Sequence, residues 1–189
     1  QGYNASYGAD AAAFNATDRS RSDQNLDFSA LARYTPNETS SYEFGFSRKT
    51  RSPNLYERFA WSTGGMAMRM VNLAGDGNGY VGNPNLLPET AHTLSATADW
   101  HDASGQSWGV RLTPWVSQVH NYIDAKRCSG GSGTMSVCNA ANLTAQQKFV
   151  YLRFDNADAR LWGFDVSGFM VLGKTDWLGA LRLDGSLSQ

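Results

Sequence analysis

Three methionines are the first candidates for chemistry in this sequence. Met66, Met68 and Met70 occupy alternate positions of one short segment. Alternate residues of an extended segment lie on the same side, so the three thioether sulfurs could reach a single ion. Thioethers are soft donors that suit Cu(I). The alternative is that these flexible side chains fill gaps against a neighbouring loop or domain, as methionines often do.

A pair of cysteines offers a second kind of chemistry. Cys128 and Cys138 flank a segment rich in glycine and serine, and the chain has no other cysteine. In an oxidising compartment such a pair predicts a disulfide, which would stabilise the loop by about 3 kcal/mol on the chain-entropy model. The alternative is a thiolate metal site, which needs reduced cysteines.

Other candidate groups do not assemble into a catalytic motif. Asp76–Gly79 resembles the start of a calcium loop, but Tyr80 stands at the next ligand position and the later glutamate is missing, so we predict a turn. His92, His101 and His120 are scattered; we expect interfacial roles, with a substrate path as the alternative for His92 and His120. Nucleophile motifs and phosphate loops are missing, so we expect no enzyme and no permanently bound cofactor.

Composition narrows the class of protein. The 189 residues carry 16 basic and 17 acidic side chains, a net charge of −1, so we expect no nucleic-acid partner. Mean hydropathy is −0.43, and no apolar run approaches the roughly 18 residues of a membrane-spanning helix. A membrane barrel remains open, because its strands are apolar on one face only.

Period-2 alternation of apolar and polar residues is the main structural signal and predicts β-strands. The apolar faces carry no charge, as expected if they meet lipid, where a basic side chain costs about 2–4 kcal/mol. Phe169 breaks the pattern by lying on a polar face. The charges on the polar faces should pair with one another, or be hydrated against another domain; they are Asp27, Arg33, Glu43, Asp99, Arg111, Arg182 and Asp184. The predicted strands are 25–34, 42–49, 93–100, 108–117, 162–172 (with a start as early as 149) and 177–187.

The connections between these strands favour a barrel over a soluble β-sandwich, which also alternates with period 2. Short and long connections alternate along the chain, as expected for the short periplasmic turns and long external loops of an outer-membrane barrel. Aromatic residues at the short turns predict an interfacial girdle; they are Tyr34, Tyr42, Trp100, Trp108 and Trp177. The short connections are 35–39, 102–106 and 173–176, and the long ones are 51–88 and 124–148.

Six strands are too few for a closed barrel, since the smallest membrane barrels have about eight. An open sheet in lipid would leave two unpaired edges. The N-terminus also lacks a basic region followed by an apolar core, and the last residues lie inside a strand-like run. We therefore expect the chain to be a piece of a longer protein.

The first long loop carries two motifs. It opens with Arg51-Ser52-Pro53-Asn54-Leu55-Tyr56-Glu57 and closes with Gly82-Asn83-Pro84-Asn85-Leu86-Leu87-Pro88-Glu89. Both resemble signatures of TonB-dependent outer-membrane receptors. The strand with Asn156, Gly163 and Asp165 is similar to a later wall strand of that family, and the resemblance extends from about Phe14 onward. The residues that match the two motifs are Arg51, Pro53, Glu57, Gly82, Asn83, Pro84, Pro88 and Glu89.

The resemblance implies an all-β fold, an antiparallel transmembrane β-barrel of about 22 strands, of which residues 1–189 would supply about six as part of one barrel domain. It implies a bacterial outer-membrane location, contact with outer-membrane lipid, and energy from the TonB complex. The coupling would pass through a plug domain, and this sequence contains neither the plug nor the TonB-contacting segment.

Within the family, Met66–Met70 and Gly75–Asn83 look most like the copper-receptor branch. We therefore predict active import of a scarce nutrient, with copper as the transported ligand and a ferric siderophore as the alternative metal-chelate substrate. A passive porin or an adhesin barrel is an alternative of another class. A plug domain with a TonB box in the full-length protein would discriminate between them.

Overall fold

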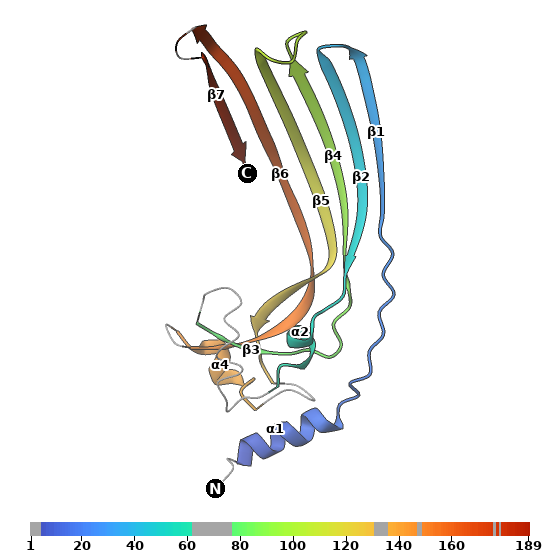
Figure 1. Cartoon of the computed structure of the whole chain (residues 1–189). Helices are drawn as coiled ribbons and strands as arrows, with labels where there is room; N and C mark the ends of the chain where they lie inside the picture. The colour runs from blue at the N-terminus through green and yellow to red at the C-terminus, as the bar shows by residue number, and fades with distance from the viewer. Residues whose placement is uncertain (1–4, 62–76, 131–135, 147–148, 176, 178) are drawn as a thin grey trace. The chain divides into compact units, whose positions relative to one another are not determined.

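The structure is a computed structural model, and it describes residues 5–61, 77–130, 136–146, 149–175, 177 and 179–189. Most of the described chain is strand, and the elements follow one another as shown in Figure 1. Among the described residues, no helix has the length and hydropathy to span a bilayer. The elements are α1 (Ala5–Ala16), β1 (Phe28–Asn37), β2 (Ser40–Arg51), α2 (Leu55–Phe59), β3 (Gly79–Val81), β4 (Glu89–His101), β5 (Trp108–Arg127), α4 (Ala140–Thr144), β6 (Tyr151–Thr175) and β7 (Gly179–Ser188).

The strands form one sheet in the order β1-β2-β4-β5-β6-β3, with β7 paired to β6. Neighbouring long strands are antiparallel where their register is defined, from β1 with β2 to β6 with β7. This confirms the predicted all-β, antiparallel fold of a barrel segment. The six predicted strands correspond to β1, β2, β4, β5, β6 and β7.

Two features were not predicted from the alternation. Strand β3 is only three residues long and pairs in parallel with the start of β6, too short to give a period-2 signal. Strand β5 extends beyond the clear alternation, to Arg127, whereas β6 begins at Tyr151, close to the early start near 149 that the sequence allows. Within β5, Asn121 has a positive φ of 56°, which interrupts the regular alternation around it.

The chain groups into two compact units. The first, called the loop unit here, consists of Gln1–Asn25, Arg51–Glu89 and Asn121–Ala157. The second, called the sheet unit, consists of Leu26–Thr50, Thr90–His120 and Asp158–Gln189.

In the sheet unit, charged side chains on the polar faces pair with one another as predicted. Arg33 on β1 lies directly opposite Glu43 on β2 and donates hydrogen bonds to its carboxylate. Asp99 on β4 and Arg111 on β5 are register partners with an Nε–Oδ2 distance of 2.9 Å. The remaining pairs are Asp27 with Lys49 at 3.7 Å and Arg182 with Asp184 at 2.7 Å.

The opposite face of the sheet unit is apolar and exposed. Leu94, Leu172 and Leu183 each expose more than half of their surface. Aromatic side chains gather near the short turns: the rings of Tyr34 and Tyr42 stack at 6.4 Å, and Trp100 donates its indole N–H to the Tyr42 hydroxyl at 3.2 Å. This arrangement agrees with the predicted aromatic girdle.

Phe169, which broke the alternation, covers a glycine on the neighbouring strand. A β-carbon at Gly109 would lie 2.7 Å from the Phe169 ring, so the ring occupies the space that a side chain would take. The Arg182 guanidinium lies over the same ring, with Cζ at 4.0 Å from the ring centroid. An aromatic ring over a strand glycine, with a cation on the ring, accounts for an apolar residue on a polar face.

The short turn between β4 and β5 is held by Asp102. Its carboxylate accepts hydrogen bonds from Ser104 and from the backbone N–H groups of Trp108 at 3.0 Å and Ser107 at 2.8 Å. The Ser104 hydroxyl and these N–H groups hold the pKa of Asp102 well below its usual range. Gly105, at φ +65°, makes the turn possible in this form.

His92 and His120 lie on the apolar side of the sheet unit. The His92 ring stacks on Phe46 at 6.3 Å and meets the His120 ring edge-on at 5.9 Å. His120 in turn lies 3.3 Å from Asp158. Phe46 has the parity of the apolar face of β2, so this cluster agrees with an interfacial role and not with a substrate path along the polar face.

Candidate functional site

The motif residues of the first long loop meet in the loop unit, around Arg51. Arg51, the last residue of β2, donates Nε–H to Glu89 at 2.6 Å and Nη1–H to both carboxylate oxygens of Glu57 at 3.0 Å. Glu89 is the first residue of β4, and its other oxygen accepts the Ile123 N–H of β5 at 2.7 Å. One guanidinium therefore connects the end of one strand, the start of the next and the helix between them.

Helix α2 is built by a capping box at the start of the loop. Asn54 accepts the Glu57 N–H at 2.9 Å, and Glu57 accepts the Asn54 N–H at 2.7 Å. The buried Pro53 precedes the cap, where its ring favours extended backbone just before a helix starts. Glu57 thus serves both the helix cap and the Arg51 ion pair, which accounts for its place in the motif.

The closing motif packs against α2 through backbone contacts. Gly82 donates its N–H to Ala60 O at 2.6 Å, and Asn83 donates its N–H to Glu57 O at 2.8 Å. A β-carbon at Gly82 would lie 2.6 Å from Ala60 N and from Arg58 O. Only glycine fits this approach. The Asn83 side chain then reaches β6, donating Nδ2–H to Phe154 O at 3.1 Å.

We predict that Gly82→Ala will loosen the contact between α2 and the closing motif. The clash is with backbone atoms, which cannot rotate away, so a destabilisation of about 1–3 kcal/mol is expected for this segment. Hydrogen exchange followed by mass spectrometry on the full-length protein should show faster exchange in residues 57–61 and 82–89. Gly173→Ala is the matched control, because a β-carbon there meets nothing within 4 Å. Equal exchange in the two variants would contradict the assignment.

Two further residues of the loop unit were not predicted as site residues. Arg58, which is buried, pairs with Asp23 at 2.7 Å and donates to Leu86 O at 3.1 Å. The hydrogen bond from Arg58 to the Asp23 carboxylate holds the pKa of Asp23 below its usual value, against the opposing effect of burial. Asn156 accepts the Leu87 N–H at 2.9 Å and donates to Asn121 O at 2.7 Å. It thereby fixes the unusual backbone of Asn121.

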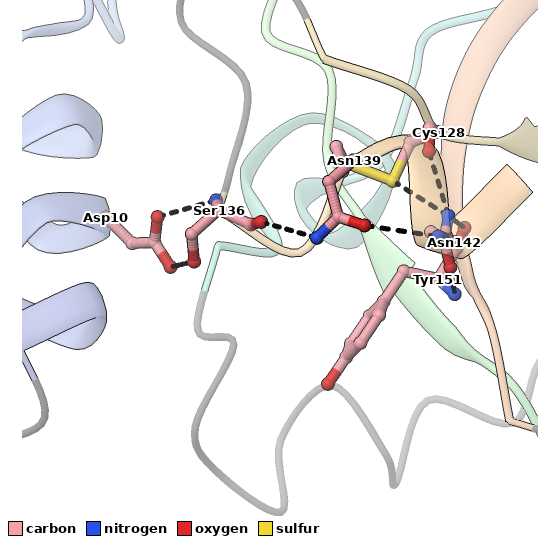
Figure 2. Close-up of a disulfide and its surroundings, with 7 residues drawn as sticks. Asp10, Cys128, Ser136, Asn139, Asn142 and Tyr151 are labelled. Atoms are coloured by element: carbon pink, nitrogen blue, oxygen red, sulfur yellow. Dashed lines mark hydrogen bonds between the residues drawn. A yellow bond between two sulfur atoms is a disulfide. The ribbon is translucent and has the colours of Figure 1, made fainter.

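The second long loop is closed by a disulfide between Cys128 and Cys138, both buried. Asn142 of α4 anchors the loop: its side chain donates to Cys128 O and Tyr151 O, both at 2.8 Å, and accepts the Tyr151 N–H at 2.7 Å. Figure 2 shows how these bonds converge on one amide. A single side chain therefore satisfies three backbone groups on two segments.

Helix α1 docks on this loop through a buried carboxylate. Asp10 accepts the backbone N–H of Ser136 at 2.9 Å and its hydroxyl at 2.8 Å (Figure 2). Phe14 stacks on Trp61 with ring centroids 5.2 Å apart, and both pack against a small core of Val81 and the two disulfide cysteines. The loop unit thus has its own apolar core with the disulfide inside it.

The loop unit also contains a cavity of about 340 Å³ beside the disulfide. Basic side chains from β5 and β6 line it, among them Arg127 and Arg153, together with the motif residue Asn83. Among the described residues, no group of three or more His, Cys, Asp or Glu side chains could hold a metal ion. Met66, Met68 and Met70, the predicted copper ligands, lie outside the described residues.

The chain is similar to known receptors. The family model described as "TonB dependent receptor-like, beta-barrel" matches residues 2–188, whereas none of the curated proteins compared with the chain matches it. Among solved structures, the siderophore receptor PirA from Pseudomonas aeruginosa matches with 19% identity and a TM-score of 0.48, over 86% of this chain and 25% of that one.

The hemophore receptor HasR of Serratia marcescens, a double mutant in complex with its hemophore HasA and heme, matches with 13% identity and a TM-score of 0.50. The match covers 85% of this chain and 22% of that one. At this identity the likeness to HasR shows the fold alone. The chain therefore spans about a quarter or less of the length of the receptors it resembles.

Proposed function

Because the chain belongs to the TonB-dependent receptor family, we propose that it forms part of the outer-membrane barrel of a receptor that actively imports a scarce nutrient. The family consists of transport receptors and not of enzymes. In the proposed mechanism the external loops capture the substrate, and a plug driven by the TonB complex then moves to let it pass. The barrel wall and loops position the substrate and perform no covalent chemistry.

The observation that carries the proposal is the family match over residues 2–188, together with the Arg51 cluster that the family motifs form. The cluster links the loop to the end of β2, the start of β4 and, through Ile123, to β5, which gives a rigid base on which a substrate site can be built. The exposed apolar face of the sheet unit supports a location in outer-membrane lipid.

Copper is the first candidate substrate. The support is the spacing of Met66, Met68 and Met70 and their resemblance to the copper-receptor branch. Copper would be a transported ligand, and not a resident cofactor of the protein.

We expect the triple variant Met66/Met68/Met70→Leu of the full-length receptor to lose at least about tenfold in Cu(I) affinity, because leucine keeps the volume and removes the soft donor. A competition titration with a Cu(I) chelator in detergent measures the loss. Met170→Leu is the matched control, since Met170 is an exposed methionine of the sheet unit. Unchanged affinity in the triple variant would exclude these ligands and bring a ferric siderophore forward.

The siderophore alternative has its own support in the cationic cavity beside the disulfide, which suits an anionic metal chelate. Uptake assays separate active import from a passive porin or an adhesin. In cells that express the full-length receptor, import should stop when TonB is deleted. Uptake that is independent of TonB would contradict the proposed function whatever the substrate.

A further inference from the structure

The apolar face of the sheet unit carries charged and titratable side chains at the strand ends that lead to the long loops. This basic cluster, as we call it, lies on four neighbouring strands, β2, β4, β5 and β6 (Figure 1). A charged side chain on such a face costs least near the edge of a bilayer, so the cluster lies at the level expected for lipid headgroups. Its members share the parity of the apolar residues further along the same strands; they are Arg48, His92, His120, Asp158 and Arg160.

The basic cluster has a net positive charge. His120 Nδ1 lies 3.3 Å from Asp158 Oδ1, which is the one carboxylate of the cluster. Arg48 donates Nη1–H to Leu26 O, a neutral acceptor. Arg160 follows Asp158 by two residues and therefore lies on the same face. Neither arginine forms an ion pair with another residue that the structure describes, so two arginines stand against one carboxylate.

An apolar groove of about 460 Å³ begins beside the basic cluster on the same face. On β4, Leu94 in the groove lies two residues from His92 in the cluster. The register of β4 with β5 sets Ala96 opposite Pro114, and these short side chains leave space between their larger neighbours. The apolar side chains that line the groove are Phe44, Leu94, Ala96, Pro114 and Val116.

We propose that the groove and the basic cluster together bind one membrane lipid whose headgroup carries two phosphates. The groove takes part of an acyl chain, and the cluster takes the phosphates, so that the apolar and charged parts of the site match those of the lipid. The arginine fork suits bidentate contacts with phosphate oxygens. The inference rests on the proposed location in outer-membrane lipid and adds a lipid site that the import of a substrate does not use.

The positions of the two arginines favour two phosphates over one. Arg48 is on β2 and Arg160 on β6, three strand spacings apart in the sheet order, which is roughly 14 Å. The rings of His92 and His120, 5.9 Å apart, belong to the two strands between them. Each arginine therefore has space for its own phosphate, and a headgroup with two phosphates spans the cluster.

The test is native mass spectrometry of the full-length protein in detergent, titrated with lipid A, which carries two phosphates, and with its monophosphoryl form. Wild type should bind lipid A at least about tenfold more tightly than the monophosphoryl form. Arg48→Gln/Arg160→Gln should lose this preference and weaken lipid A binding by at least about tenfold, whereas Arg48→Lys/Arg160→Lys keeps the charges and should keep most of the binding. The matched control Arg33→Gln/Lys49→Gln removes the same charge from the polar face and should stay within about threefold of wild type.

A substitution in the groove tests the acyl-chain part of the site. Ala96→Phe places a ring where the acyl chain would lie, and should weaken binding of both forms of lipid A by at least about fivefold. The preference for two phosphates should remain, because the arginines are unchanged. Ala98→Phe is the matched control, since Ala98 lies on the same face of β4 and outside the groove.

Each outcome decides the inference. A preference for lipid A that is lost in the double glutamine variant and kept in the controls supports it, provided that circular dichroism shows the variants to be folded. Equal binding of the two forms by wild type overturns it, as do equal losses in the two double glutamine variants or unchanged binding in Ala96→Phe. If the double glutamine variant does not fold, the lysine and groove variants still decide. TonB-dependent uptake without lipid A binding would refute the lipid site and leave the proposed function standing, whereas lipid A binding without such uptake would do the reverse.

Discussion

Arg51→Met is expected to lower the free energy of local unfolding of the loop unit by about 2 kcal/mol and to leave the stability of the sheet unit unchanged. Arg51 is the common partner of Glu57 and Glu89, whose side chains are only 10% and 13% exposed. Removing it leaves two nearly buried carboxylates with like charge and no cation between them. Breaking a fully buried pair costs about 3–5 kcal/mol, and we expect less because the Arg51 side chain itself is 46% exposed and water can replace part of it.

The geometry of the fork, and not charge alone, should matter at this position. Arg51 reaches Glu89 through Nε and Glu57 through Nη1, so the two contacts lie on different nitrogens. Lysine has a single ammonium and cannot span both carboxylates in this way. Arg51→Lys should therefore destabilise the loop unit less than Arg51→Met does, but leave it less stable than in wild type. Adding Glu57→Gln to Arg51→Met should reduce the destabilisation, because it removes one of the two unpaired negative charges.

Hydrogen exchange of the full-length receptor measures this effect by segment. A loss of about 2 kcal/mol accelerates exchange from local opening by roughly 30-fold, and we expect it in residues 54–60 and around Ile123. Arg33→Met is the control, because its ion pair with Glu43 in the sheet unit has a 64% exposed arginine and should be worth less than about 1 kcal/mol. Equal exchange in Arg51→Met and wild type would show that the cluster does not hold the loop.

The strands could be predicted because the two faces of the sheet have different chemistry. Leu94 lies between Thr93 and Ser95, and Leu183 lies between the charged residues Arg182 and Asp184. Charged residues of the polar face pair with residues of the neighbouring strand, as Asp99 does with Arg111. Such a pattern is local and repeats, so it is visible in one sequence. Phe169 was the exception, since its reason lies on another strand, in the missing side chain of Gly109.

The site was predicted in part. The motif residues Arg51, Glu57 and Glu89 were identified by resemblance, and Asn54 with Glu57 three residues later is a capping-box pattern that the sequence itself contains. The contacts of Asn142 and Asn156 could not be predicted, because their partners are backbone groups of distant segments. Backbone carbonyls carry no sequence signal. The pairing of Arg58 with Asp23 likewise depends on the fold that brings them together.

Loss of the disulfide should release the second long loop and, with it, helix α1. In the double variant Cys128→Ser/Cys138→Ser, the chain-entropy model predicts a cost of about 3 kcal/mol for a loop of this length. The two sulfurs also lie in the apolar core with Val81, where serine hydroxyls would be buried among apolar groups. Since Asp10 of α1 is bound to Ser136 within the same loop, opening the loop removes the contact that docks the helix.

Two measurements check this prediction. Alkylation and mass spectrometry of protein purified without reductant should find no free thiol, and finding two would refute the disulfide itself. Hydrogen exchange in the double variant should rise by roughly 100-fold in residues 136–145 and rise in α1 as well. Wild type treated with a reductant should behave in the same way.

Asn142→Asp tests how much the Asn142 side chain contributes to holding the second long loop, independently of the disulfide. The carboxylate would keep the bond from the Tyr151 N–H but would face the carbonyls of Cys128 and Tyr151, to which the amide now donates. We expect faster exchange near α4 while the disulfide stays intact, because unpaired, opposed acceptors cost about 1–3 kcal/mol. If Asn142→Asp exchanged like wild type, the disulfide alone would hold the loop, and the double serine variant should then account for all of the opening.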